Sequence, residues 1–353
     1  RSDTPMDVTA MPSPIASVGP NVGAYTDSTV TGGQSYYYRI GVFRNGEELI
    51  SDEHLLGARK FGLFVGSNDK KVRRLDSNNN EVWSFTGHTN KISNIVLDSN
   101  YNIYSGSNDN TVKKIDPDGN EVWTFTGHTN GVTSVTIDNI NNFIYTGSSD
   151  AEVKKIDLDG NEQWTFNNFS EEINSVRVDS SGYVYATTSS VLRKIDPSTG
   201  NEITSGSWPY NHSFGARMMD VDENGNTYVG NTSRKILKID TDGNEITTGN
   251  WPFSNTDTPT DIVYHTDGYI YSTSKNETIV KIDPNDGSLV LQFTAFSTDA
   301  YALALDSNGT IYGGGYGQAL RKFDPSGNEI TTGNWPYENI NDTIHCIAVY
   351  LDY

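Results

Sequence analysis

The sequence predicts an all-β fold, a seven-bladed β-propeller. One hairpin pattern, clearest in residues 112–130 (VKKIDPDGNEVWTFTGHTN), recurs from residue 72 almost to the C-terminus. It joins two segments rich in Val, Ile, Trp and Phe through a D-x-D-G-N turn, as antiparallel strands do. The Asp that closes the first segment recurs every 39 to 44 residues, at Asp76, Asp116, Asp157, Asp196, Asp240, Asp283 and Asp324. A period near forty that holds only strand signals is typical of four-stranded propeller blades.

Four strands can be assigned within one repeat. Residues 92–98 are mostly apolar and are expected to form the innermost strand, followed by strands at 102–107, 112–116 and 121–125. The innermost strand recurs with a terminal Asp at positions 98, 138, 179, 222, 267, 306 and 352.

The order of the strands predicts how the ring closes. Residues 62–67 form a second-strand segment that no innermost strand precedes, whereas residues 344–350 form an innermost strand that nothing follows. We therefore expect the C-terminal strand to complete the N-terminal blade, which removes two exposed sheet edges. The propeller is predicted to span residues 59–353.

Residues 1–58 are predicted to form a separate, partial β-sandwich. Strand-like segments alternate there around Gly-Gly and Asn-Gly turns. Residues 25–40 (YTDSTVTGGQSYYYRI) resemble the back half of a fibronectin type III module, and the resemblance implies that Tyr36 or Tyr38 forms the tyrosine corner. Half a sandwich has an open edge, so we expect the natural polypeptide to continue N-terminally or a neighbouring chain to complete the sheet.

Composition limits the classes of partner. The chain carries 25 Lys and Arg against 45 Asp and Glu, a net charge of −20, which argues against nucleic acid or an anionic membrane as partner. No run of 18 apolar residues is present, so no membrane insertion is expected. The single cysteine, Cys346, excludes an internal disulfide and lies in an apolar strand pattern that favours a buried thiol.

Residues 87–116 and 127–157 resemble WD40 repeats, with a Gly-His start and an S-x-D turn. The resemblance implies structural hydrogen bonds between His88 and Asp109 and between His128 and Asp150, which we favour over catalysis or metal binding. Ile115 and Ile156 replace the family's Trp. The later blades lack the Gly-His pair and are more similar to quinoprotein-type or NHL-type propellers.

The D-x-D-G turns, such as residues 116–121, 157–160 and 240–243, resemble the start of a calcium loop. A loop of the EF-hand type needs a bidentate Glu at its twelfth position, where Gly127 stands. Asp and Asn initiate tight turns and Gly supplies positive φ, so a hairpin explains the pattern. We expect no cofactor and no metal site, with weak Ca²⁺ binding at these turns left open.

Three repeats carry a longer arm that ends in Trp-Pro-aromatic. One interpretation is an outer strand whose aromatic residues pack between blades. The other is a set of aromatic platforms that stack on sugar rings. The candidate ligand-binding residues are Trp208, Tyr210, Trp251, Phe253, Trp335 and Tyr337.

No catalytic motif stands out. The six His residues show no H-x-H or H-E-x-x-H spacing, and quinoprotein dehydrogenases often use a vicinal disulfide that one cysteine cannot form. Acid pairs for glycoside hydrolysis would come from different blades and cannot be read from spacing. We therefore expect a non-enzymatic protein, with a propeller enzyme acting on glycans as an alternative.

The functional prediction comes from the combination of modules. A fibronectin-like segment followed by a propeller resembles virion proteins of tailed bacteriophages and bacterial surface proteins. The resemblance implies a virion component of tail or fibre, extracellular, whose propeller binds a host-surface glycan or protein or another virion subunit. A secreted bacterial adhesion or scaffold protein is the main alternative.

Overall fold

The computed structural model describes residues 35–38, 41–44, 47–50, 54–57 and 61–351, except 214, 317–318, 339 and 341. Before residue 61 it describes the backbone of the strands only. Two compact units are found, residues 1–62 with 350–353, and residues 63–349. Every regular element within the described residues is a strand, and none of these residues forms a helix able to span a membrane.

The first unit contains two antiparallel pairs. Strand β1 (Ser35–Tyr38) pairs with β4 (His54–Gly57), and β2 (Gly41–Arg44) pairs with β3 (Glu47–Ile50). The described strands give no support to the expected fibronectin-like sandwich, which stays a prediction. Tyr36 and Tyr38 face Leu56 and His54 in the β1–β4 register, and their side chains lie outside the described part of the chain.

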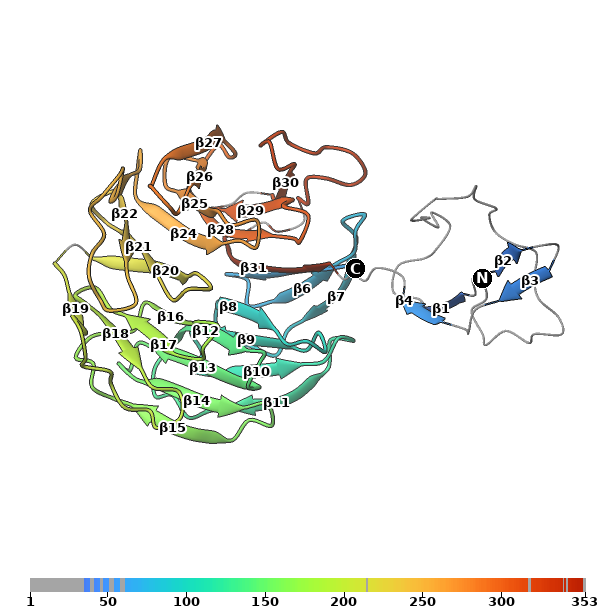
Figure 1. The fold of residues 1–353 in the computed structure, drawn as a ribbon. Coiled ribbons are helices and arrows are strands. Elements are labelled where there is room, and N and C mark those ends of the chain that lie inside the picture. The colour runs from blue at the N-terminus through green and yellow to red at the C-terminus, as the bar shows by residue number, and fades with distance from the viewer. Residues whose placement is uncertain are drawn as a thin grey trace. The chain divides into compact units, whose positions relative to one another are not determined.

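The second unit consists of seven antiparallel sheets that follow one another around a ring (Figure 1). The strands of blades 1 to 4 are, from inside outward, β31 (Ile344–Leu351), β5 (Phe61–Ser67), β6 (Val72–Leu75) and β7 (Glu81–Phe85); β8 (Ile92–Leu97), β9 (Ile103–Ser107), β10 (Val112–Ile115) and β11 (Glu121–Phe125); β12 (Val132–Asp138), β13 (Phe143–Ser148), β14 (Val153–Asp157) and β15 (Glu162–Phe166); β16 (Ser175–Val178), β17 (Val184–Thr187), β18 (Val191–Ile195) and β19 (Tyr210–Asn211).

Blades 5 to 7 follow the same order. Their strands are β20 (Ala216–Val221), β21 (Thr227–Asn231), β22 (Lys235–Ile239) and β23 (Phe253–Ser254); β24 (Pro259–Tyr264), β25 (Ile270–Ser274), β26 (Thr278–Ile282) and β27 (Leu289–Thr294); β28 (Ala300–Leu305), β29 (Ile311–Gly315) and β30 (Arg321–Phe323). In blade 7 a single bridge between Leu320 and Tyr337 stands in place of a fourth strand. The seven-bladed, all-β architecture predicted from the period is confirmed.

The ring closes as the strand order predicts. Strand β31 lies beside β5 in a sheet with β6 and β7, so the C-terminal strand joins three N-terminal ones. The backbone N–H of Asn68 also donates to the carbonyl oxygen of Thr343 at 3.0 Å. The first and last strands of the propeller are therefore held by hydrogen bonds in one blade.

One detail of the innermost strands differs from the expected pattern. The turn after β24 begins at His265, whose N–H donates to the carbonyl oxygen of Tyr269, and not at Asp267. Asp267 lies inside that turn and accepts from the Tyr271 hydroxyl at 2.7 Å. Asp267 therefore does not occupy the position that Asp98 and its counterparts share. Strand β31 ends at Leu351, and Asp352 lies outside the described residues.

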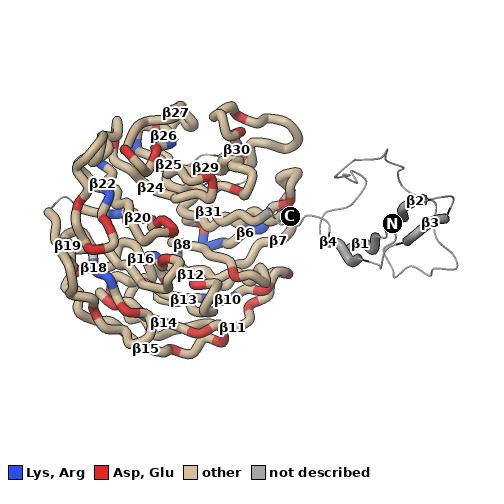
Figure 2. The backbone as a smooth tube through the Cα atoms, viewed as in Figure 1, with Lys and Arg blue, Asp and Glu red and all other residues tan. Residues whose placement is uncertain are grey.

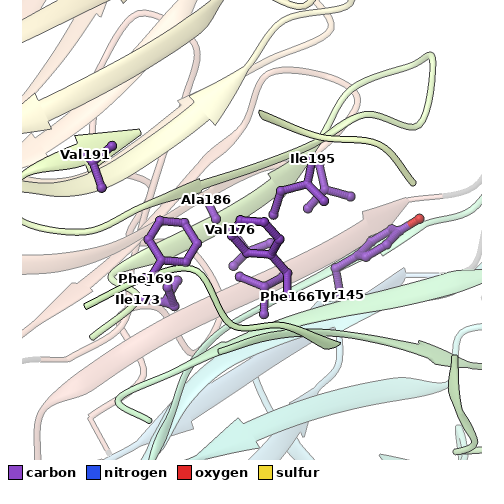
Figure 3. Close-up of a cluster of buried hydrophobic side chains, with 10 residues drawn as sticks. Tyr145, Phe166, Phe169, Ile173, Val176, Ala186, Val191 and Ile195 are labelled. Atoms are coloured by element: carbon purple, nitrogen blue, oxygen red, sulfur yellow. The ribbon is translucent and has the colours of Figure 1, made fainter. Parts of the chain in front are cut away.

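The hydrophobic core is divided among the interfaces between adjacent blades. In one cluster, Tyr145 and Phe166 of blade 3 pack with Val176 and Ile195 of blade 4, and Phe169 and Ile173 join them from the connecting loop (Figure 3). Each sheet buries both faces against its neighbours, which explains why the inner strands are mostly apolar. Asp and Glu residues are spread around the ring (Figure 2).

Candidate functional site

The innermost strands surround a central channel with a cavity of about 420 Å³. Its wall mixes aliphatic and polar residues. The residues that contribute charged, polar or sulfur-containing side chains are Ser93, Asn94, Thr133, Ser134, Thr136, Asn174, Ser175, Arg177, Met218, Asp261, Tyr301, His345 and Cys346. Channels of this kind are common ligand sites, so the chemistry of these groups decides what the channel could do.

Arg177 and Asp220 form an ion pair at the channel. Arg177 extends from β16 and its Nε lies 3.3 Å from Oδ1 of Asp220 on β20. Asp220 also accepts the N–H of Tyr264 on β24 at 2.7 Å. Burial raises the pKa of Asp220, although the Arg177 charge acts in the opposite direction. The pair therefore connects blades 4, 5 and 6.

Asp261 repeats this arrangement one blade further on. Its Oδ2 accepts a hydrogen bond from the N–H of Leu303 on β28 at 3.0 Å. Its Oδ1 accepts one from the N–H of the next residue in the chain, Ile262, at 2.9 Å. Burial raises the pKa of Asp261 to about 7, against the opposing effects of Arg177 and of these two hydrogen bonds. A carboxyl with this pKa could act as a general acid or base, but both of its oxygens are already engaged.

Hydroxyl and amide groups join other blades in the same manner. The N–H of Val176 on β16 donates to Oγ of Ser134 on β12 at 3.0 Å, and Nδ2 of Asn174 donates to the carbonyl oxygen of Ala216 at 2.8 Å. Innermost strands have one edge without a sheet partner, and these side chains satisfy its backbone groups. The described polar groups of the channel thus serve mainly to connect neighbouring blades.

His345 and Cys346 lie on β31, at the blade that closes the ring. Burial lowers the pKa of His345 to about 4, so its imidazole is neutral at pH 7, and Nε2 lies 3.2 Å from Oδ1 of Asn68. Cys346 is 5% exposed, and burial raises the pKa of its thiol. A protonated, buried thiol is a poor nucleophile and metal ligand.

The arms that end in Trp-Pro-aromatic do not present stacking platforms. Trp208, Trp251 and Trp335 are 5%, 4% and 6% exposed, and Phe253 and Tyr337 are also buried. Tyr210 is half-buried, and its hydroxyl donates to Glu245 of the next blade at 2.6 Å. The sugar-stacking interpretation is corrected on this point, because buried rings offer no free face to a ligand.

All six tryptophans instead occupy one repeated position. Each lies 5.7–5.9 Å from a Tyr or Phe ring of its own blade. The short strands and the long arms therefore place Trp at the same point. In four blades the indole and a basic side chain donate to one carbonyl oxygen in the next blade's turn: Arg74 and Trp83 to Pro117, Lys114 and Trp123 to Leu158, Lys155 and Trp164 to Pro197, Lys194 and Trp208 to Thr241.

The D-x-D-G turns receive these contacts. Asp116 accepts the N–H groups of Asp118 and Asn120 at 3.0 and 2.8 Å, and the Asn120 amide as well. Gly119 has φ of +92°, and a Cβ there would lie 2.9 Å from the Trp83 ring of the preceding blade. Glycine is required at this position both by the turn and by the close approach of the indole.

The two Gly-His repeats build similar polar networks. His88 Nδ1 lies 2.8 Å from Oδ2 of Asp109, and its Nε2 lies 2.8 Å from Oγ of Ser105. In the next blade His128 makes the corresponding contacts with Asp150 at 3.0 Å and with Thr146 at 2.8 Å. Both imidazoles are buried, and each network fixes the loop that leads into the next innermost strand.

Arg177, Asp220 and Asp261 were not among the residues singled out in the sequence. A signal for them exists, since each is a charged residue inside an innermost segment that is at least half apolar, as in Ser175–Val178 (SVRV). Such a residue must find a partner on a neighbouring strand. Which strand that is depends on the ring geometry and cannot be read from spacing.

The comparisons with known proteins agree with the fold. Residues 68–292 match the model of a family described as outer membrane protein assembly factor BamB. A crystal structure of the computationally designed Ika8 protein matches with a TM-score of 0.63 at 17% identity, covering 81% of this chain and 86% of that chain. This likeness concerns the fold alone. No curated protein sequence matches.

Proposed function

We propose, from the premise that this chain belongs to the family described as outer membrane protein assembly factor BamB, that its propeller is a non-enzymatic binding module within a larger assembly. The family's description names an assembly role, and the fold by itself does not set a chemistry. The propeller is rigid, and its loops and outer edges contact the partner.

The observation that supports a non-enzymatic role is the use of the channel's charged groups. Asp220 and Asp261, the buried carboxylates of the innermost strands of blades 5 and 6, each accept a backbone N–H from the next blade. Arg177 is paired with Asp220. Catalysis by either carboxylate would require it to leave bonds that connect the blades, and such bonds are costly to break when buried.

The outer edges and loops provide surface for a partner. Val82 on β7 and Val122 on β11 are 50% and 53% exposed, at the same position of adjacent blades. Leu289 and Val290 on β27 are about half exposed as well. Outer strands present unpaired backbone groups, and proteins usually protect such edges with charge. Exposed aliphatic residues there favour protein contacts over glycan contacts.

The assembly that we place first is a bacteriophage virion, in which the propeller is part of tail or fibre and contacts either the host surface or another subunit. The fibronectin-like resemblance of residues 1–58 motivates this choice. An extracellular bacterial adhesion or scaffold protein comes second, and the family's description favours its scaffold form. A propeller enzyme acting on glycans is the third.

The test applies the full chain to a broad glycan array and to protein fractions of purified phage particles and of bacterial envelopes. A Val82→Lys, Val122→Lys double variant is the control, because both positions are exposed and its fold can be checked by circular dichroism. If the wild type binds one protein fraction and the double variant does not, the result supports a non-enzymatic binding module. Release of sugars from the array, lost on Asp261→Asn substitution, contradicts it and favours the enzyme.

A further inference from the structure

Blade 3 contains a cluster of potential metal ligands that goes beyond the proposed function. His128, Asp150 and Glu152 each offer one ligand atom, and the three atoms lie within 4.8 Å of one another. The residues are separated by 22 and 2 positions, so no metal-binding spacing is visible in the sequence. The loop before β12 supplies the His, and the turn between β13 and β14 supplies both carboxylates.

Blade 2 provides an internal comparison, because its His88 network is built in the same way, with the Ser105 hydroxyl in place of that of Thr146, and lacks the second carboxylate. Where blade 3 has Glu152, directly before β14, blade 2 has Thr111, directly before β10. The Thr111 hydroxyl donates to Oδ1 of Asp109 at 2.6 Å and lies 3.3 Å from Nδ1 of His88. The blade 2 network is therefore completed by a neutral hydroxyl within the protein.

Glu152 changes the electrostatics of the corresponding place. Oδ2 of Asp150 accepts from the N–H of Thr129 at 2.9 Å, and Oδ1 accepts from the N–H of Glu152 at 3.1 Å. A second carboxylate now stands beside the first. Two negative charges near a neutral imidazole attract a divalent cation. The blade 2 arrangement has only one carboxylate, because Thr111 is neutral.

The nearest cation, Lys154, does not depend on Glu152. Its Nζ lies 3.0 Å from Glu152, but also 3.4 Å from Glu162 and 2.8 Å from Oγ1 of Thr165. In blade 2 the corresponding Lys113 contacts Glu121 at 3.0 Å and Thr124 at 2.7 Å, which are the counterparts of Glu162 and Thr165. Lys154 therefore keeps the partners that suffice in blade 2 when Glu152 turns to a metal.

The imidazole is prepared for coordination by its other nitrogen. With a proton on Nε2, His128 donates to the buried Oγ1 of Thr146 at 2.8 Å, and Nδ1 is left with a lone pair facing the carboxylates. Such a second partner fixes the ring and the tautomer of a metal-bound His.

We propose that His128, Asp150 and Glu152 bind one Zn²⁺ ion. One nitrogen and two carboxylate oxygens suit Zn²⁺, which often takes three protein ligands and leaves a fourth position open. The side chains of His128 and Asp150 are 0% and 6% exposed, whereas that of Glu152 is 30% exposed. The open position therefore faces solvent on the Glu152 side, where a water or a partner's side chain completes the coordination.

Isothermal titration of the full chain with Zn²⁺ at pH 7.5 tests the site, with Co²⁺ absorption as a second readout. The wild type should bind one ion at this site. Glu152→Thr, which copies the residue that blade 2 tolerates, should weaken binding at least tenfold without changing the melting temperature of the metal-free protein. Glu152→Gln, which retains the size but not the charge, should also weaken it.

The reciprocal variant is Thr111→Glu, which places a carboxylate beside His88 and Asp109. It should add a second ion per chain. The proposal is overturned if the wild type binds no Zn²⁺, if Glu152→Thr binds as tightly as the wild type, or if Thr111→Glu still binds only one ion. The chain's other His residues cannot imitate the expected result, because neither substitution alters them.

Discussion

The indole N–H of Trp123 donates a 3.0 Å hydrogen bond to the carbonyl oxygen of Leu158, in the turn of the following blade. Lys114 donates to the same oxygen at 2.9 Å. In this way a residue of the outermost strand of one blade is attached to the next, and the contact recurs around part of the ring. The repeated Trp is therefore a connection between blades.

Replacing Trp123 by Phe should lower the free energy of unfolding. The ring still packs against Tyr104, but the Leu158 carbonyl loses one of its two donors. A neutral hydrogen bond contributes about 0.5–1.5 kcal/mol. The matched control is Trp251→Phe, because the Trp251 indole nitrogen has no hydrogen-bond partner in the described structure. Urea denaturation should show Trp123→Phe to be less stable than Trp251→Phe by about 1 kcal/mol, and equal losses would contradict the role assigned to the bond.

Deleting residues 343–353 should open the ring. Strand β31 carries Ile344, Cys346 and Ile347 into the core of blade 1, and these side chains are 0%, 5% and 8% exposed. Burying an apolar side chain contributes about 1.5–3 kcal/mol, so the loss is on the order of several kcal/mol. The melting temperature should fall by about 10 °C, given roughly 2–4 °C per kcal/mol for a large domain.

A synthetic peptide of residues 343–353 provides the control for this deletion. Added in excess to the shortened chain, it should restore part of the lost thermal stability by pairing with β5, whereas a peptide of scrambled order should not. An unchanged melting temperature of the shortened chain would show that β31 does not close the ring.

Asp261 should make the stability of the propeller depend on pH. Its pKa is about 7 in the folded protein and near 3.8 when unfolded, so between these values the folded state binds more protons. Stability is then fully present below pH 4 and declines as the pH rises through 7. In Asp261→Asn, which keeps an acceptor for the Leu303 N–H, this decline should be absent.

The measurement is the difference in free energy of unfolding between wild type and Asp261→Asn at pH 5 and at pH 8. From pH 5 to pH 8, the free energy of unfolding of the variant should rise by about 2 kcal/mol relative to that of the wild type. The full shift in pKa corresponds to about 4 kcal/mol, of which only the part between pH 5 and the folded pKa falls within the measured interval. Asp220, whose pKa is also raised by burial, is retained in both proteins, so its contribution cancels in the difference. Parallel stability curves would show that Asp261 is not held in a raised-pKa environment.

The propeller could be predicted because its signals are local and repeated. The alternation of residues 112–116 and 121–125 around an Asp-Gly turn fixes a hairpin, and the period of about forty fixes the number of blades. Closure by residues 344–350 followed from the order of segments alone. The prediction at Asp267 was wrong because sequence spacing aligns carboxylates, whereas backbone hydrogen bonds define the turn.

The site residues could not be predicted in this way. The partners of Arg177 and Asp261 lie one or more blades away, at separations set by the ring. Similarly, the sequence of Trp208 and Trp251 shows an aromatic beside a proline but not which way the ring faces. Exposure is a tertiary property, and here the rings face the neighbouring blade.

A final prediction compares Tyr104 with Tyr145, which occupy the same position in blades 2 and 3. The Tyr104 hydroxyl donates to Oδ2 of Asp98 at 2.9 Å. The Tyr145 hydroxyl is buried without a hydrogen-bond partner among the described residues, because the turn after Asp138 is one residue longer than the turn after Asp98. A hydrogen bond to a charged group contributes about 1.5–3 kcal/mol, and a buried unsatisfied hydroxyl is unfavourable.

Substituting each tyrosine by Phe in turn should therefore give opposite results. Tyr104→Phe removes a bonded hydroxyl and should lower the free energy of unfolding by about 1.5–3 kcal/mol. Tyr145→Phe removes an unbonded one and should leave stability unchanged or raise it slightly. Both variants keep the ring that packs against Trp123 or Trp164, so packing does not differ between them. Chemical denaturation of the two proteins measures the difference, and equal losses would mean that Tyr145 has a bonding partner like that of Tyr104.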